Sequence, residues 1–498
     1  MVAVVSDMFR TPPVPRQLRP YQAKIIDDLR FRFLAGSKRV VVQLPTGGGK
    51  TLTSAKIIES ALAKGTRVMF TVPRLSLIDQ TVTEFEREGL GPIGVMQANH
   101  PRTDASAPVQ VASVQTLARR EIPDGFGLVI QDEAHERAEI IETLMARWPK
   151  TYFVGLSATP WAKGMGLIWQ DLIIASTLTE MIDAGYLSKF VAYAPFIPDL
   201  TGVKTIAGDY AENGLEKVMS EGGIIASVVK TWLERGENRP TLCFGVNRAH
   251  AAEMQRQFEA VGVAAGYCDA YTDSVERALL ARRFRAGEIK IVCSVRTLTT
   301  GIDWPVSCII DAAPTKSKIL HCQKLGRGLR INPGTEDLVI LDHAGNSLRN
   351  GLVTDIHHDK LSMAAKGDKE PKPPAEKLPK ECANCAALMT GLVCPYCGHV
   401  KKIVSGVKEA DGELVEVTGK RNPATHDDKQ RFWSMALGLD RERGKDGKLA
   451  KGLYKGKFDV WPRGLIDRPI TPDQAFRNYA KSRAIAYAKS KEVRLELS

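Results

Sequence analysis

A glycine-rich segment near the start of the chain carries the first group of residues that could do chemistry. The string Leu44-Pro-Thr-Gly-Gly-Gly-Lys50-Thr51 follows an apolar run and leads into an amphipathic one. Glycines let consecutive backbone N–H groups turn toward phosphate oxygens, a lysine adds positive charge, and a threonine hydroxyl can ligate Mg²⁺. The string has Leu44 where the usual phosphate loop has its first glycine. We expect an ATP site made by Thr46, Gly47, Gly48, Gly49, Lys50 and Thr51.

An acidic pair after a second apolar run supplies the groups that ATP hydrolysis needs. Asp132 and Glu133 follow the run at Leu128–Gln131 and belong to the string Asp-Glu-Ala-His. In a parallel sheet the ends of neighbouring strands meet at one edge, so we expect this pair near the phosphates. We predict that Asp132 holds Mg²⁺ through a water molecule, together with Thr51, and that Glu133 orients and deprotonates the attacking water.

Two arginines late in the chain are candidates for arginine fingers. Gln323, Arg327 and Arg330 are spaced by four and three residues, so the helix predicted around Ser317–Leu329 would place them on one face. If that face closes over a bound nucleotide, Arg327 and Arg330 can neutralise charge on the γ-phosphate. The alternative is a basic helix face that contacts only solvent.

Four of the nine cysteines form a metal-ligand pattern. Cys382, Cys385, Cys394 and Cys397 are spaced C-x2-C-x8-C-x2-C in a segment too short to build its own core. Four thiolates at this spacing are typical of a closed, structural Zn²⁺ site whose metal supplies folding energy. The other five cysteines are scattered, which indicates a reducing cytoplasm and not a disulfide framework.

The elements that must position these residues alternate in type along the first 340 residues. Strand-like runs such as Arg39–Leu44 and Thr241–Val246 alternate with helical patterns such as Thr51–Ala63 and Arg248–Val261. This alternation predicts an α/β fold with two parallel, doubly wound sheets. Turn-forming residues at 200–225 mark the predicted junction between the sheets.

Composition and charge limit the class of protein. Of 498 residues, 44% are hydrophobic and 25% are charged, which excludes a disordered or fibrous chain. No apolar run reaches the roughly 18 residues of a membrane-spanning helix. The net charge is +12, and residues 351–498 contribute +8 of it, with 28 Lys and Arg against 20 Asp and Glu. This surplus favours a polyanionic partner, and the alternative is a solubilising tail.

The motifs together resemble those of the superfamily 2 helicases and translocases of the DEAH-box type over about residues 17–345. The matching segments are LRPYQ at 18–22, VPRLSLIDQ at 72–80, SVQTLAR at 113–119, SAT at 157–159, CFGVN at 243–247, SVRTLTTGID at 294–303 and QKLGRGLR at 323–330. The resemblance implies two RecA-like domains that close over ATP and reopen after hydrolysis, which would move the protein along a nucleic acid strand.

The resemblance also implies roles for residues that spacing alone does not identify. Gln22 would contact the edge of the adenine base, and Gly301, Asp303 and Gln323 would complete the nucleotide site. Contacts with nucleic acid, mostly to phosphates, would come from Arg74, Thr116, Asn247 and Ser294. Phosphate contacts position a strand without reading its base sequence.

These patterns divide the chain into five predicted parts. They are a first RecA-like domain at 1–200, a second at 201–358, a Pro-rich linker at 359–380, a zinc knuckle or ribbon at 381–400, and a basic nucleic-acid-binding region at 401–498. In the last part, lysines and arginines alternate with Phe432, Trp433, Tyr454, Phe458 and Trp461. This mixture suits phosphate contact with base stacking, and equally a small helical domain with buried aromatic residues.

The predicted function is that of an ATP-dependent DNA helicase or translocase that uses ATP, Mg²⁺ and Zn²⁺. Three alternatives are an RNA helicase, the motor subunit of a restriction or defence complex, and a nucleic-acid-binding module with an inactive motor. The intact Lys50, Asp132, Glu133 and Arg330 argue against an inactive motor. We expect DNA as the main partner, other replication or repair proteins as further partners, no membrane contact, a monomer, and a location in a bacterial or phage-infected cytoplasm.

Overall fold

The computed structural model describes residues 16–97, 100–194, 197–206, 208–220, 222–299, 304–365, 378–401 and 424–495. The chain divides into two compact units, residues 1–403 and 404–498, and each is described by itself. Among the described residues, no helix combines the length and the apolar character needed to cross a bilayer.

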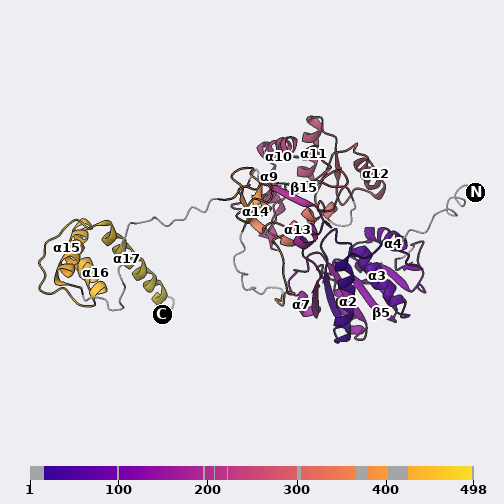
Figure 1. The fold of residues 1–498 in the computed structure, drawn as a ribbon, viewed down its shortest axis with the longest axis horizontal. Helices are drawn as coiled ribbons and strands as arrows, with labels where there is room; N and C mark the ends of the chain where they lie inside the picture. The colour runs from indigo at the N-terminus through magenta and orange to yellow at the C-terminus, as the bar shows by residue number, and fades with distance from the viewer. Residues whose placement is uncertain are drawn as a thin grey trace, which may run out of the picture. The chain divides into compact units, whose positions relative to one another are not determined.

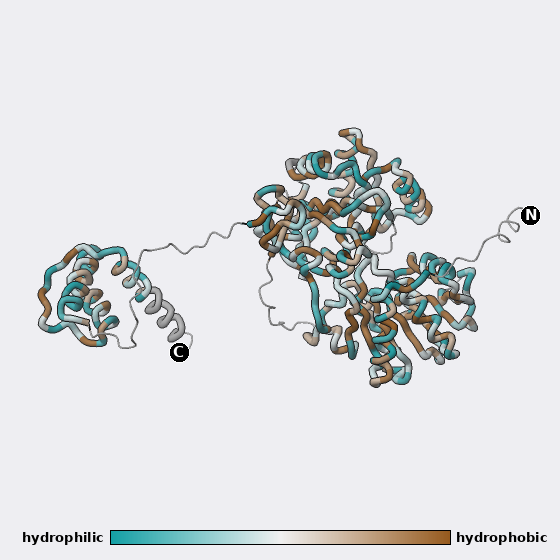
Figure 2. Tube along the Cα trace, viewed as in Figure 1, coloured by the Kyte–Doolittle hydropathy of each residue, from teal (hydrophilic) through white to brown (hydrophobic). Residues whose placement is uncertain are grey.

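The first α/β domain is built on seven of the described strands, all parallel, in the order β3-β4-β2-β5-β6-β1-β7. Helices α2, α3 and α4 cover one face of this sheet, and α5 and α6 cover the other (Figure 1). Because both faces are covered, the strands are continuous apolar runs, and hydrophobic colour follows them in Figure 2. The strands are β1 (Arg39–Gln43), β2 (Arg67–Val72), β3 (Ile93–Val95), β4 (Val109–Ser113), β5 (Phe126–Gln131), β6 (Tyr152–Ser157) and β7 (Asp171–Ile174). The helices are α2 (Pro20–Leu34), α3 (Lys50–Leu62), η1 (Leu75–Leu77), α4 (Ile78–Arg87), α5 (Val114–Leu117), α6 (Glu139–Arg147), α7 (Met165–Ile168) and α8 (Leu178–Asp183).

The second α/β domain repeats this design with six of the described strands, also parallel, in the order β12-β13-β11-β14-β15-β8. Helices α10 and α11 pack on one face, and α12 and α13 on the other. The predicted fold class is therefore confirmed. The strands are β8 (Lys189–Tyr193), β11 (Thr241–Phe244), β12 (Ala265–Cys268), β13 (Ile291–Ser294), β14 (Cys308–Asp311) and β15 (Asp337–Asp342). The remaining elements are β9 (Thr205–Ile206), β10 (Asp209–Tyr210), α9 (Glu212–Met219), α10 (Gly222–Arg235), α11 (Arg248–Ala260), α12 (Ser274–Arg285), η2 (Thr297–Thr299), α13 (Lys318–Gly326) and α14 (Asn346–Asn350).

The junction between the two sheets lies earlier than the sequence predicted. Strand β8 pairs in parallel with β15 and belongs to the second sheet, so a domain boundary after residue 200 is too late. The chain crosses between β7 and β8, through α8 and Gly185. The turn-rich residues after 200 form the β9-β10 hairpin and lead into α9, inside the second domain. A short apolar run such as β8 does not reveal from its periodicity which sheet it joins.

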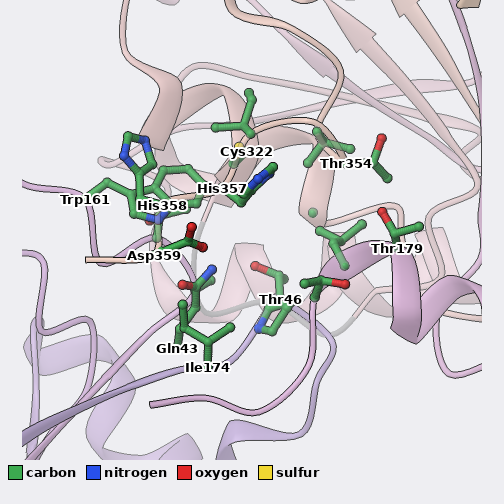
Figure 3. Close-up of a pocket in the computed structure, with 18 residues that line it drawn as sticks. Gln43, Thr46, Trp161, Ile174, Thr179, Cys322, Thr354, His357, His358 and Asp359 are labelled. Carbon is green, nitrogen blue, oxygen red and sulfur yellow. The ribbon is translucent and has the colours of Figure 1, made fainter. Parts of the chain in front are cut away.

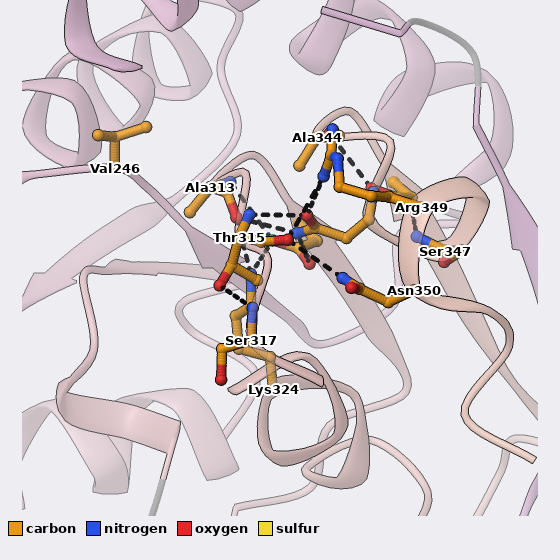
Figure 4. A network of polar contacts seen from close by, with 12 residues as sticks. Val246, Ala313, Thr315, Ser317, Lys324, Ala344, Ser347, Arg349 and Asn350 are labelled. Atoms are coloured by element: carbon orange, nitrogen blue, oxygen red, sulfur yellow. Dashed lines mark hydrogen bonds and ion pairs between the residues drawn. The ribbon is translucent and has the colours of Figure 1, made fainter. Parts of the chain in front are cut away.

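A buried polar network fixes α13 on the carboxyl edge of the second sheet (Figure 4). Lys324 of α13 is 2% exposed, and its ammonium donates to the carboxylate of Asp311 and, at 2.9 Å, to the carbonyl of Ala313. Asn346 of α14 donates to the other Asp311 oxygen at 2.9 Å and accepts from the backbone N–H of Thr315 at 2.8 Å. Because breaking a buried ion pair costs several kcal/mol (roughly 3–5), this network holds α13 firmly in place.

The second unit is a small helical domain, which we call the C-terminal helical unit (residues 424–495). It contains α15 (His426–Glu442), α16 (Lys448–Phe458) and α17 (Gln474–Leu495). Thr425 begins α15 with a capping box in which its hydroxyl and the carboxylate of Asp428 satisfy each other's backbone N–H groups. Helix α17 starts at Gln474, two residues after Pro472.

Candidate active site and metal centre

The phosphate loop begins where β1 ends, at the carboxyl edge of the first sheet. Gly47 and Gly49 have φ values of 82° and 80°, which side chains disfavour, and Gly49 caps α3 so that the helix N-terminus faces the loop. Gln22 donates to the carbonyl of Gly48 at 3.1 Å and accepts from the backbone N–H of Arg19 at 2.9 Å. Gln22 therefore supports the loop, and its contact with adenine stays a prediction.

Lys50, Asp132 and Glu133 meet beside the phosphate loop. Lys50 Nζ lies 2.8 Å from Glu133 Oε1 and 3.8 Å from Asp132 Oδ1. Burial lowers the pKa of Lys50, but the two carboxylates outweigh burial and hold it above its ordinary value. Burial raises the pKa of Glu133, but Lys50 and His135 lower it more, so Glu133 is ionised at neutral pH. The lysine is therefore paired with the carboxylate that the predicted mechanism uses as the base.

The backbone of Glu133 adopts a conformation that non-glycine residues rarely take. Its φ is 48°, in the left-handed region, which costs of order 1 kcal/mol or more. Neighbouring contacts hold it there, since its backbone N–H donates to Asp132 Oδ1 at 3.0 Å and that of Ala134 donates to the Leu156 carbonyl at 2.9 Å. This turn directs the Glu133 carboxylate toward Lys50 at the end of β5.

His135 connects the first domain to the second. Its Nδ1 lies 2.8 Å from the hydroxyl of Ser157 at the end of β6, and its Nε2 lies 3.1 Å from the amide nitrogen of Gln323 on α13. Burial lowers the pKa of His135, which keeps the ring neutral. Because the Gln323 amide donates to Nε2, the ring proton lies on Nδ1 and points to Ser157. Gln323 therefore contacts the acidic motif, in the region where the sequence placed it.

Arg327 and Arg330 reach the same cavity, but they do not share a helix face. Helix α13 ends at Gly326, Arg327 is its C-terminal cap residue, and Arg330 lies beyond the helix. The expected helix to Leu329 is thus too long, because the chain turns to meet β8 at this point. Both arginines still line one cavity of about 250 Å³ with Lys50, Thr51 and the acidic pair. Groups from both α/β domains therefore line one cavity, and their catalytic roles stay predictions.

The donors at this cavity fit a magnesium ion. The Thr51 hydroxyl and the Asp132 carboxylate both line it, and hard oxygen donors are what Mg²⁺ prefers. Burial raises the pKa of Asp132 to about 6, although Lys50 opposes the shift. A bound cation would favour the ionised Asp132 carboxylate and would offset the free-energy cost of burying its charge.

The segment between α8 and β8 (residues 184–188), which we call the hinge, contributes residues that the sequence did not single out. The Tyr186 ring lies 5.4 Å from that of Tyr21, and the Arg19 guanidinium lies 4.8 Å from the Tyr186 ring centre. Ser188 donates its hydroxyl to the carbonyl of Arg330 at 3.1 Å. The LRPYQ string contains Tyr21, but no recognised motif pointed to Tyr186. Only the fold reveals that the hinge runs beside the nucleotide site.

A second cavity of about 180 Å³ lies behind the phosphate loop, between the two α/β domains (Figure 3). Thr46 of the loop, Trp161 after the SAT string, and Cys322 of α13 line it together with residues 353–359. Gly326 of α13 approaches Thr46 so closely that a Cβ on the glycine would lie 2.9 Å from Thr46 Cβ. Movement of α13 would therefore displace Thr46 of the phosphate loop or open a gap beside it.

The chain after the second domain returns to the first one as a strap (residues 353–365). The His358 ring lies 5.0 Å from that of Trp161, and the backbone N–H of Gly166 donates to the Ser362 carbonyl at 2.8 Å. A Cβ on Gly166 would lie 3.1 Å from the Ser362 carbonyl oxygen, closer than most Cβ contacts, so the strap favours glycine there. The expected linker at 359–380 therefore starts later than predicted, because residues 359–365 belong to the strap. Residues 366–377 lie outside the described residues.

The four cysteines of the metal-ligand pattern come together as predicted. The Sγ atoms of Cys382, Cys385, Cys394 and Cys397 all lie within 4.8 Å of one another. The antiparallel pair β16 (Lys380–Glu381) and β17 (Leu388–Met389) and two turns bring the CxxC pairs face to face. Four thiols at these distances can close around one tetrahedral ion.

The cysteine module (residues 378–401) is not separate from the motor, which corrects the expectation of an independent knuckle. Cys382, Ala387, Met389 and Cys394 are buried in the same apolar cluster as residues of β8, α10 and β15. The Tyr396 ring lies 6.4 Å from that of Tyr193 at the end of β8, at right angles to it. The module thus covers the edge of the second sheet, which a short segment needs in order to bury apolar surface.

The four predicted nucleic-acid contacts lie at strand ends on the carboxyl edges of the two sheets. Arg74 and Thr116 follow the neighbouring strands β2 and β4, and Asn247 and Ser294 belong to the ends of β11 and β13. Asn247 caps α11 by accepting from the His250 backbone N–H at 2.9 Å. Ser294 is fully buried, so its side chain does not face solvent. These roles stay predictions, and Gly301 and Asp303 lie outside the described residues.

Comparison with known proteins assigns both α/β domains. Residues 16–162 match the family described as "Type III restriction enzyme, res subunit", and residues 224–332 match the "Helicase conserved C-terminal domain". A "51.5 kDa protein" of a Lactococcus phage is 25% identical over 91% of this chain and 100% of its own length. A Saccharomyces cerevisiae protein named "Putative ATP-dependent helicase IRC3" is 28% identical over 66% of this chain and 52% of its own.

A solved structure has the same fold. The "ATP-dependent Type ISP restriction-modification enzyme LlaBIII bound to DNA" is 19% identical, with a TM-score of 0.50 over 66% of this chain and 28% of that one. The chain therefore spans the whole phage relative, about half of the yeast relative, and about a quarter of the solved enzyme.

Proposed function

We propose that the chain is an ATP-hydrolysing helicase of superfamily 2 and that DNA is the strand along which it moves or which it remodels. One observation carries the proposal of a coupled motor: groups from both α/β domains line a single nucleotide cavity, with Lys50 and Glu133 from one domain and Arg327 and Arg330 from the other. A nucleotide bound there can bring the two domains together only while its γ-phosphate is attached. The DNA bound to the solved restriction enzyme supports DNA as the strand.

The geometry of Lys50 indicates how ATP would switch the site on. The Lys50 ammonium is paired with Glu133 at 2.8 Å. Phosphate oxygens of ATP would compete for that ammonium, which frees the Glu133 carboxylate to accept a proton from the attacking water. Arg327 and Arg330 would then stabilise charge on the γ-phosphoryl group. Thr51 and Asp132 would hold Mg²⁺, which supplies neutralisation of phosphate charge when bound.

The contact between His135 and Gln323 offers a route from hydrolysis to motion. It joins the acidic motif to α13 at 3.1 Å, and the same histidine contacts Ser157 of the SAT string at 2.8 Å. Loss of the γ-phosphate would release Arg327 and Arg330, which lie just beyond α13, and let the second domain move away. Each hydrolysis would thus open the cleft once and advance one domain along the DNA.

We also propose that the cysteine module holds one Zn²⁺ and that the protein works in a reducing cytoplasm. Four converging thiols without an open ligand position suit a structural zinc. The five other cysteines are buried and unbridged, so disulfides do not compete for the ligands.

The test is ATP hydrolysis measured with single-stranded DNA, duplex DNA, forked DNA and RNA as stimulators. Glu133→Gln removes the base and keeps its shape, so turnover should fall by roughly 100-fold or more while ATP still binds. Lys50→Ala should abolish turnover and weaken ATP binding. Glu136→Gln is the matched control, because Glu136 is a nearby carboxylate that does not line the cavity. Wild-type turnover in Glu133→Gln would exclude the mechanism, and stimulation by RNA alone would exclude DNA as the strand.

A further inference from the structure

Most aromatic side chains of the C-terminal helical unit form its core. The Phe432 ring centre lies 4.8 Å from that of Phe476, 5.1 Å from that of Phe458 and 5.6 Å from that of Tyr479. Trp433 is buried in the same cluster. Rings packed in this way cannot stack on nucleic acid bases. The other prediction from the sequence, a small helical domain with packed aromatic residues, therefore accounts for Phe432, Trp433, Tyr454 and Phe458.

Trp461 is the exception among these aromatic residues. Its side chain is 56% exposed, and it lies three residues beyond the end of α16. Single exposed apolar side chains are common on protein surfaces, but a tryptophan also offers a flat ring on which a nucleic acid base can stack.

The loop that carries Trp461 is held against α15. Gln430 donates its amide to the Ile466 carbonyl and accepts from the Ile466 backbone N–H, both at 2.8 Å. Trp433 donates its indole N–H to Asp467 at 2.7 Å, and the Ile470 backbone N–H donates to the Ser434 carbonyl at 3.1 Å. These contacts fix residues 466–470, which begin five residues after Trp461, and so limit the conformational freedom that the loop can lose on binding.

Positive charge surrounds this ring along the chain. Helix α16 contains four lysines and no acidic residue, and residues 424–495 hold 17 Lys and Arg against 9 Asp and Glu. Arg483 of α17 lies over Gly456 of α16, with its Nη2 3.3 Å from where a Cβ would be. Lys455 is paired with Asp459 at 3.0 Å, whereas no described acidic group lies within salt-bridge distance of Lys451 or Arg463. Net positive charge with one exposed ring is the combination that binds single strands.

We propose that the C-terminal helical unit binds single-stranded DNA, with Trp461 stacking on an unpaired base and Lys451, Arg463 and Arg483 contacting phosphates. This inference rests on the proposed DNA motor for its choice of DNA over RNA. Duplex DNA has no unpaired base for the ring, so the unit prefers single strands. The site would hold a strand that the motor has separated or is about to enter.

Photo-crosslinking of the full chain tests the stacking contact directly. Single-stranded DNA carrying 5-bromodeoxyuridine is irradiated with the protein, and the crosslinked peptides are identified by mass spectrometry. We expect a crosslink within residues 458–463, lost in Trp461→Ala and reduced by competing unlabelled single-stranded DNA. A crosslink map that contains motor peptides but none from this loop would overturn the proposal.

Binding measurements separate stacking from charge. Trp461→Ala should weaken binding of oligo-dT roughly 5- to 100-fold with an unchanged salt slope, and Trp461→Phe should restore most of it. Lys451→Gln with Arg463→Gln should lower the salt slope by about 0.7 per cation. Ile466→Ala is the control, since Ile466 is an exposed apolar side chain in the same loop. An equal loss in Ile466→Ala, or equal losses for duplex DNA and RNA, would overturn the proposal.

ATP hydrolysis at saturating DNA distinguishes this proposal from the proposed function. Trp461→Ala should keep wild-type turnover there, because the nucleotide cavity lies in the other unit. If wild-type protein shows no DNA-stimulated turnover but the Trp461 crosslink forms, the motor assignment to DNA fails and the binding site stands. If DNA stimulates turnover but no crosslink forms at Trp461, the proposed binding site is wrong and the DNA motor stands.

Discussion

The cysteine module and the C-terminal helical unit both follow the second motor domain in the chain, yet they obtain their cores differently. Cys382 and Cys394 of the module are buried in the cluster that also contains Tyr193 of β8. Trp433, Tyr454 and Phe476 of the helical unit are buried in a cluster of their own, and Phe432 packs against it. A segment of about 20 residues cannot bury enough apolar surface alone, whereas three helices can. Unfolding of the cysteine module should therefore destabilise the motor, whereas unfolding of the C-terminal helical unit should not.

The largest effect should follow loss of a metal ligand. Cys394→Ser should release zinc and unfold the module, and the exposed cluster should lower the thermal stability of the second motor domain. Basal ATP hydrolysis should then fall roughly tenfold or more, which can be measured with metal content and melting temperature on the same sample. Cys268→Ser is the control, a buried thiol of the same domain outside the metal cluster. Zinc loss with unchanged hydrolysis would mean that the module is independent of the motor.

A core substitution in the helical unit should be severe but local. Phe432→Ala removes a half-buried ring that packs against four others, and it should destabilise the unit by about 2–3 kcal/mol, less than loss of a fully buried phenylalanine. Calorimetry of the full chain should show one transition shifted to lower temperature and the motor transition unmoved. Phe31→Ala, at an exposed phenylalanine of the first domain, should shift neither transition. A shift of the motor transition in Phe432→Ala would contradict the separation of the two cores.

Acid should affect the two regions unequally. Burial lowers the pKa values of His250, His321 and His343 in the second motor domain to about 4 each. Because these pKa values lie below the unfolded value of about 6.5, the unfolded state binds more protons between the two, and stability falls as pH drops through that window. The loss should approach about 3 kcal/mol per histidine by pH 4. His426 is the single histidine at residues 424–495, and it is exposed.

Denaturant unfolding at pH 7 and pH 5 checks the acid prediction. The midpoint of the motor should fall more than that of the helical unit. His343→Leu removes one titrating ring that has no hydrogen-bond partner among the described residues, so it should reduce the motor's loss of stability at pH 5 by about 2 kcal/mol. An equal fall for both regions would point to a general charge effect.

The smallest effect on the motor should follow deletion of residues 402–498. Both α/β domains, the strap and the cysteine module stay intact, so DNA-independent ATP hydrolysis should change by less than about twofold. DNA affinity should fall and its dependence on salt should become shallower, because the deleted region carries most of the net charge. A deletion after residue 360 is the informative contrast, since it removes the module and cuts the strap and should inactivate the motor.

Much of the nucleotide site could be predicted because its chemistry is local in sequence. Glycines that a phosphate loop requires, a lysine after them, and carboxylates at a strand end are each recognisable within a few residues, and the structure brings Lys50, Asp132 and Glu133 together. Arg330 was placed correctly in the cavity but wrongly on a helix, because the chain leaves α13 to pair its backbone with Ser188. That contact joins positions 142 residues apart, and no local pattern encodes it.

The sequence by itself determined the two α/β domains, the phosphate loop, the acidic pair and the four converging thiols. Periodicity and ligand spacing act within one element or turn, so the residues alone specify them. Only the tertiary structure decided that β8 belongs to the second sheet, that the strap returns to Gly166, and that the cysteine module shares the motor's core. It also decided that Trp461 is exposed while Trp433 is buried. These facts depend on which apolar surfaces meet across the fold.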